Sequence, residues 1–222
     1  MNDILNYAKK INNIEENEYF INLTRVANLD NFISSQVHFV NAIDNWSKIL
    51  GIMISRVPSY NERNVLIQNL VDEHGNGEIE KNHVSTFNKF IDSLLEITKK
   101  NKDTYLLKGN YNYTKEFIES LYSLTELNWI FAISAMGMIE FTYINVSNKV
   151  HNYVCNYIDK DKINHYSLHE ILDVTHATEL FKIIEPYYKE NKMIIEKGIE
   201  KGYNMMNKLY SNYYLDLSQK SI

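Results

Sequence analysis

Apolar residues recur at intervals of three and four positions over most of this chain, and few residues interrupt the pattern. The sequence has two prolines and seven glycines among its 222 residues, and no segment alternates strictly between apolar and polar side chains. A spacing of three and four residues places apolar side chains on one face of an α-helix, whereas a strand requires a period of two. The sequence therefore predicts an all-α protein.

Helix breakers divide this pattern into segments. One helix should end before Pro58, because the residue that precedes a proline is disfavoured in a helix. Gly75 and Gly77 separate the next two helices, and Pro186 should end or kink a later one. The predicted helices span residues 2–13, 29–55, 60–74, 80–99, 112–124, 126–151, 164–185 and 188–213. No internal repeat or long linker is visible, so we expect one domain, residues 1–222, built as a bundle of about seven to eight helices.

The basic residues are dispersed along the chain. The formal net charge is −5, and no cluster of lysine and arginine stands out. Proteins that bind a phosphate backbone usually present a basic patch, so we expect no nucleic-acid partner. The single cysteine, Cys155, cannot form an internal disulfide, and the N-terminal residues lack the apolar stretch of a signal peptide. Both features favour a reducing, cytoplasmic location.

The most apolar stretch of the chain, residues 129–146, raises the question of a membrane span. It is barely long enough to cross a bilayer, and it contains a glutamate, Glu140. A buried central helix explains the stretch better, so we expect no membrane partner.

A metal-ligand pattern, HxxxDxxH, occurs near the C-terminal third as His169, Asp173 and His176. On a helix, positions i, i+4 and i+7 project from one face. The same face continues as Leu180 and Ile184, so it should point towards the core. Buried titratable groups are costly unless they are paired or bound to a metal, and nitrogen and oxygen ligands suit a first-row transition metal. The pattern therefore predicts a metal site.

Two further segments supply candidate ligands. Glu73 would end one helix and His83 would begin the next, across a turn that glycine permits. This segment could instead be a helix C-cap with exposed acidic residues, and Glu80 competes with Glu73 because it forms an ExxH pattern with His83. Glu140 is an isolated carboxylate in an apolar run, so it is paired, protonated or metal-bound if buried, or else it lies at an exposed edge.

The order of these segments resembles the haem-oxygenase-like di-iron oxidases, a group of iron-containing redox enzymes. Their first segment reads NLxDExGxG, then His and an aromatic, which corresponds here to Asn69–Gly77, His83 and Phe87. Their second is a lone Glu in an apolar helix, here Glu140, and their third is HxxxDxxH. The resemblance covers about residues 17–213, and it favours Glu73 over Glu80. The implied metal ligands are Glu73, His83, Glu140, His169, Asp173 and His176.

The resemblance also implies a fold and an activity. The fold is a haem-oxygenase-like helical bundle, shared with the TenA thiaminases and the pyrroloquinoline-quinone synthase. The activity is that of a biosynthetic oxidase or oxygenase with two Fe(II) ions, or one iron and one manganese, and O2 as co-substrate. The substrate would be a small organic molecule such as an amino acid, an amine or a fatty acid. Its reaction would be decarboxylation, C–C cleavage, desaturation or N-oxygenation.

The remaining expectations concern binding partners, alternative functions and the substrate pocket. An external electron donor could take part, and we expect a homodimer. A metal-independent enzyme resembling TenA or the quinone-cofactor synthase, or a non-catalytic helical interaction protein, remains an alternative. His165, one turn before His169, is a candidate for a supporting role beside the metal ligands. The predicted substrate pocket, for which ordinary core packing is the competing explanation, comprises Phe39, Ile43, Trp46, Phe87, Tyr122, Met136 and Tyr143.

Overall fold

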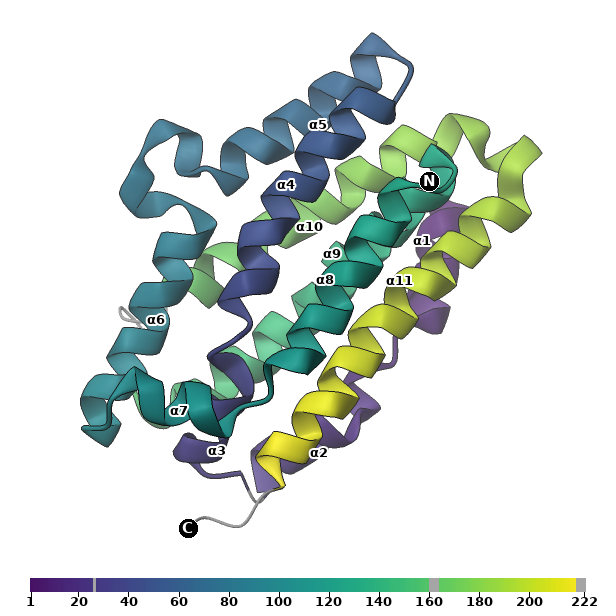
Figure 1. The fold of residues 1–222 in the computed structure, drawn as a ribbon. Coiled ribbons are helices and arrows are strands. Elements are labelled where there is room, and N and C mark those ends of the chain that lie inside the picture. The colour runs from purple at the N-terminus through teal and green to yellow at the C-terminus, as the bar shows by residue number, and fades with distance from the viewer. Residues whose placement is uncertain (26, 160–163, 219–222) are drawn as a thin grey trace.

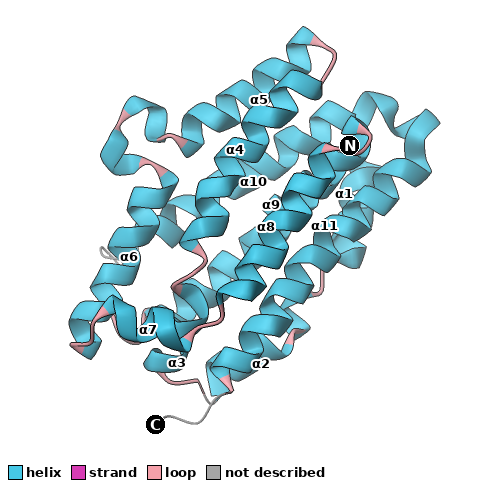
Figure 2. Ribbon diagram, in the orientation of Figure 1, coloured by secondary structure: helices cyan, strands magenta, loops and turns pink. Residues whose placement is uncertain are grey.

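The described part of the chain is helical throughout. The computed structural model describes residues 1–25, 27–159 and 164–218, but not the side chains of Thr24, Asn164 and residues 167–173. Over these ranges there are helices, short 3-10 turns and loops but no strand (Figure 2). The predicted all-α fold and its single helical bundle are therefore confirmed.

The helices follow one another with short connections. They are α1 (Asn2–Ile11), α2 (Glu18–Arg25), α3 (Leu29–Gln36), α4 (Val40–Arg56), α5 (Tyr60–Glu73), α6 (His83–Thr98), α7 (Lys102–Lys108), α8 (Tyr111–Thr125), α9 (Trp129–Val154), α10 (Asn164–Ile184) and α11 (Tyr188–Leu217). Figure 1 shows the longer helices α4, α8, α9, α10 and α11 running roughly along one direction.

Helix α9 forms the centre of the bundle. It packs along α10 and α11, and it also contacts α4 and α8. Within the described ranges it is the one helix long and apolar enough to cross a membrane, and 78% of its most apolar 18-residue window is buried inside the fold. Packing against its neighbours therefore accounts for its apolar sequence, as expected for a central helix.

Two glycines allow α11 to lie against α9. A Cβ atom at Gly202 would lie 2.2 Å from the carbonyl oxygen of Ala135 in α9. One turn earlier, a Cβ atom at Gly198 would lie 2.6 Å from the carbonyl oxygen of Phe131. Real carbon atoms do not approach this closely, so the two backbones come together at a distance that only glycine permits.

Several helix ends lie up to four residues from their predicted positions, and the set of helices differs from the prediction in two ways. The predicted helix 29–55 is two helices, α3 and α4, because the chain turns at residues 37–39, where the backbone N–H of Phe39 donates to Gln36 O at 2.8 Å. This turn contains neither proline nor glycine, so no local signal predicts it. Helices α2 and α7 were also missed, and α7 begins after Asn101, whose side chain accepts a hydrogen bond from the Asp103 N–H.

A buried carboxyl group near the end of α11 should make stability depend on pH. Burial raises the pKa of Asp216 to about 6, against a hydrogen bond from the Asn110 N–H and the charge of Lys108. An unfolded chain would have the ordinary pKa of about 4. The folded state therefore binds more protons between these values, and this contribution to stability is lost as pH rises through about 6.

Asp216→Asn should therefore stabilise the fold at pH 7.5 but not at pH 4.5. We expect its melting temperature to exceed that of the wild type by on the order of 3 °C at pH 7.5, with the difference disappearing at the lower pH. Thermal unfolding of both proteins at the two pH values measures this. An equal difference at both pH values would contradict a titrating Asp216.

Candidate metal centre

A glycine turn joins α5 to α6 and brings together two of the predicted ligands. Gly75 and Gly77 have φ angles of +69° and +87°, and a Cβ atom at Gly75 would lie 2.7 Å from the backbone nitrogen of Asn82. The Asn82 side chain then caps α6 by accepting a hydrogen bond from the backbone of the third helical residue. His83, the first residue of α6, is thereby held beside Glu73, the last residue of α5, and its Nδ1 hydrogen-bonds the Glu73 carboxylate.

Glu80, the alternative ligand in this segment, lies on the surface. Its side chain is 79% exposed and forms an ion pair with Lys89 of α6, at 2.7 Å. The hydrogen bond and the charge of Lys89 lower the pKa of the Glu80 carboxyl. Glu73, by contrast, is buried, so the fold directs Glu73 and not Glu80 to the interior.

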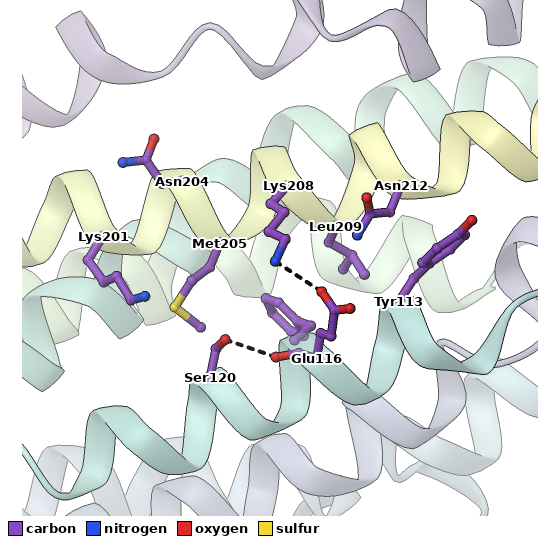
Figure 3. A pocket seen from close by; sticks show the side chains of 10 residues that line it. Tyr113, Glu116, Ser120, Lys201, Asn204, Met205, Lys208, Leu209 and Asn212 are labelled. Carbon is purple, nitrogen blue, oxygen red and sulfur yellow. Dashed lines mark hydrogen bonds and ion pairs between the residues drawn. The ribbon is translucent and has the colours of Figure 1, made fainter.

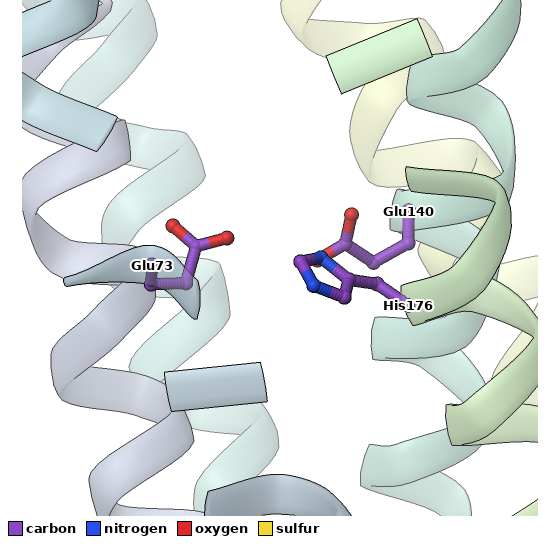
Figure 4. Close-up of side chains that lie close together, drawn as sticks. All are labelled: Glu73, Glu140 and His176. Atoms are coloured by element: carbon purple, nitrogen blue, oxygen red, sulfur yellow. The ribbon is translucent and has the colours of Figure 1, made fainter. Parts of the chain in front are cut away.

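Three helices contribute one buried ligand-type side chain each to a common point. Glu73 comes from α5, Glu140 from α9 and His176 from α10 (Figure 4). One potential ligand atom of each lies within 4.8 Å of the others, and the residues are 6%, 6% and 1% exposed. Figure 4 shows the Glu73 side chain directed towards the other two from the opposite helix. Two carboxylates and an imidazole, all buried, are a donor set that suits iron.

The other half of the HxxxDxxH pattern falls outside the described side chains. The backbones of His169 and Asp173 lie in α10, two turns and one turn before His176. Their side chains are among those that the structure does not describe, so their part in the site stays a prediction.

Two histidines of this region, His176 and His165, contact the side chains of Asp72 and Thr86. His176 Nε2 lies 3.4 Å from a carboxylate oxygen of Asp72, which is a long hydrogen bond. His165 is fully buried, lies 3.1 Å from Thr86 Oγ1 through its Nδ1, and has its ring 4.9 Å from the ring of His83. A carboxylate beside a metal-binding histidine fixes the orientation of its ring. Asp72 stands directly before Glu73, but no pattern in the sequence marks it as a partner of His176.

An apolar pocket lies next to these side chains. It has about 50 Å³ accessible to water, and its wall includes both Glu140 and His83. Four of the seven predicted pocket residues line it: Phe39, Ile43, Trp46 and Tyr143. The lining also includes Ala42, Phe117, Ile139 and Met206, which sequence analysis did not single out.

The other three predicted pocket residues lie elsewhere. The Phe87 ring is buried 5.8 Å from the ring of Phe39, and Met136 is fully buried in α9. The Tyr122 hydroxyl donates to the Asn45 side chain at 2.8 Å. Helical periodicity identifies such residues as buried, but it does not say which of them face a cavity.

Two buried tyrosines belong to the helices that carry Glu140 and His176. Tyr143 of α9 lines the pocket, and Tyr166 of α10 is 1% exposed. Burial raises the pKa of the Tyr166 hydroxyl well above its ordinary value, so this hydroxyl stays neutral.

The family of this chain follows from comparison with known proteins. The solved structure of a CADD-like protein of unknown function from Nostoc punctiforme superposes with a TM-score of 0.75 at 15% sequence identity, covering 98% of this chain and 100% of that one. At this identity the likeness shows the fold alone. No curated protein sequence matches the chain significantly. The family described as iron-containing redox enzymes matches residues 34–206, which include all six predicted ligands. The chain therefore belongs to the family of iron-containing redox enzymes.

Proposed function

We propose that the protein is a non-haem iron oxidase or oxygenase that binds two iron ions and uses O2 to oxidise a small organic substrate. The observation that carries this proposal is the buried group of Glu73, Glu140 and His176, which three helices bring within 4.8 Å of one another. The residues that would hold the ions are Glu73, His83, Glu140, His169, Asp173 and His176. Membership of an iron-containing redox family supports the choice of metal.

The carboxylates and imidazoles of the chain would have different roles at such a centre. Carboxylates can bridge two ions and stabilise their oxidised state, while imidazoles supply neutral donors. Two bound ferrous ions would supply two electrons to O2. The hydrogen bond between His83 and Glu73, and the contact of His176 with Asp72, would orient these side chains before a metal arrives.

The apolar pocket would position the substrate. Because Glu140 and His83 belong to its wall, a molecule in the pocket would lie beside the metal centre. Its other walls are mainly aliphatic and aromatic, so they would exclude water from the reacting atoms. An amino acid, an amine or a fatty acid would be the substrate, undergoing decarboxylation, C–C cleavage, desaturation or N-oxygenation. The homodimer, the cytoplasmic location and an external electron donor stay predictions.

Metal uptake tests the proposal directly. Protein freed of metal under anaerobic conditions should bind about two ferrous ions per chain, and mixing with O2 should then produce an absorbance change absent without iron. Supplying iron and manganese together, followed by elemental analysis, distinguishes an Fe/Fe from an Fe/Mn centre. Specific uptake of less than one metal per chain, with no change on adding O2, would instead favour a metal-independent enzyme resembling TenA.

A further inference from the structure

We propose that the substrate carries a carboxylate and reaches the apolar pocket through a groove between α8 and α11, with Phe117 as the gate. This inference rests on the proposed function, because it takes the pocket beside Glu140 as the substrate site. It adds an access route, a binding site for the head group and a choice among the substrate classes.

The groove lies on the outer side of α8 and α11 (Figure 3). It has about 190 Å³ accessible to water, and its floor includes Phe117, Met205 and Leu209. Its rim is polar, and Figure 3 shows Lys208 of α11 reaching towards Glu116 of α8. The groove therefore combines an apolar floor with a charged edge.

One aromatic ring separates the groove from the pocket. Phe117 lines both cavities and is 7% exposed. Beside it, two consecutive methionines face opposite ways, since Met205 lines the groove and Met206 lines the pocket. Methionine side chains are flexible and repack easily. Rotation of Phe117, with adjustment of these methionines, would therefore join the two cavities.

The charges at the rim favour an anion. Lys201 and Lys208 both line the groove, with Glu116 as the one acidic residue of its lining. Lys208 pairs with Glu116 at 2.9 Å, and both side chains are more than half exposed. Lys201 forms no ion pair with any side chain in the described ranges. Exposed ion pairs contribute little to stability, so an incoming carboxylate can displace Glu116 from Lys208 at small cost.

These features select one class of substrate. A carboxylate head would remain at the two lysines while an apolar body passes Phe117 into the pocket walled by Phe39, Ile43 and Trp46. An amine without a carboxylate would be repelled at the rim. The groove thus favours a carboxylate with an aliphatic or aromatic body over an amine.

Fluorescence quenching of Trp46 tests this route without iron. The chain has two tryptophans, so Trp129→Phe leaves Trp46 as the single emitter. In this background 8-bromooctanoate should quench Trp46 saturably, since its bromine would enter the pocket, whereas 8-bromooctylamine should not. Lys201→Gln with Lys208→Gln should weaken the apparent affinity about 10-fold, and Lys182→Gln, an exposed lysine on α10, should leave it unchanged.

Stopped-flow mixing tests the gate. Phe117→Ala should speed the onset of quenching about 10-fold by removing the ring, and Phe117→Leu should have a smaller effect in the same direction while retaining a folded core. Unchanged rates in both folded variants would overturn the gate. Equal quenching by the amine, or an affinity that does not respond to the two lysines, would overturn the carboxylate site.

Failure of this inference can be told apart from failure of the proposed function. All measurements use metal-free protein and report binding, so they do not depend on iron uptake. A protein that binds two ferrous ions but shows no quenching by 8-bromooctanoate retains its proposed function and loses this route. A protein that shows the quenching pattern but takes up no iron would support the carboxylate site and contradict the proposed oxidase function.

Discussion

Replacing Glu140 with glutamine is expected to lower the affinity for ferrous iron by about 100-fold or more without destabilising the metal-free protein. Glu140 is 6% exposed in the central helix, and its carboxylate lies beside Glu73 and His176. A buried carboxylate is costly when no metal compensates its charge, and glutamine keeps the shape while removing that charge. A residue that serves only the fold would show the opposite pattern, a loss of stability.

Melting temperatures with and without iron measure both effects. Ferrous iron at about 100 times its dissociation constant should stabilise the wild type by about 2.7 kcal/mol, which raises the melting temperature by about 5–10 °C in a chain of this length. This rise should vanish in Glu140→Gln and in Glu73→Gln. Glu80→Gln is the matched control, because Glu80 is exposed in the segment next to Glu73 and should keep the full rise.

An unchanged response to iron in Glu140→Gln would remove this residue from the metal site. A response lost in Glu80→Gln but kept in Glu73→Gln would reverse the choice between the two glutamates. Metal-free Glu140→Gln melting well below the wild type would mean that the carboxylate holds the fold through its protein contacts.

Sequence could predict the types and order of the site residues better than their surroundings. Glu73, Glu140 and His176 stand out in the sequence because a buried carboxylate or imidazole is costly unless it is paired or bound to a metal. Which helices face each other is a tertiary property, so nothing local identifies Phe117 and Met206 as pocket residues or pairs Asp72 with His176. These positions come from the packing of α5, α8 and α11 around α9 and α10.

The helix boundaries also separate features that local sequence can predict from features that depend on tertiary packing. Asn82, Asn110 and Asn128 each cap a helix by accepting a hydrogen bond from the first turn that follows. The predicted helices nevertheless began at residues 80, 112 and 126 and not at His83, Tyr111 and Trp129, directly after these caps. The turn between α3 and α4 was not readable. At this turn His38 Nε2 lies 3.1 Å from Leu106 O of α7, a contact between residues more than 60 positions apart in the chain.

Replacing Gly202 with alanine is expected to destabilise the protein by about 2 kcal/mol, although alanine is the better helix former. Helix propensity alone would favour alanine by about 1 kcal/mol. The new methyl group would lie 2.2 Å from the Ala135 carbonyl oxygen, which is backbone and cannot swing aside. Helix α11 would have to move away from α9 along the length of the core, and overpacking of this kind costs about 3 kcal/mol.

The same substitution at Gly51 should have the opposite sign. Gly51 is exposed within α4, and a Cβ atom there would meet nothing within 4 Å. Gly51→Ala should therefore gain close to the full helix propensity, about 1 kcal/mol, and raise the melting temperature by about 2–4 °C, while Gly202→Ala lowers it by about 4–8 °C. Thermal unfolding of the two variants measures the difference. A stabilised Gly202→Ala would mean that α9 and α11 do not approach as closely as the fold requires, and the placement of Glu140 in the centre of the bundle would then lose its support.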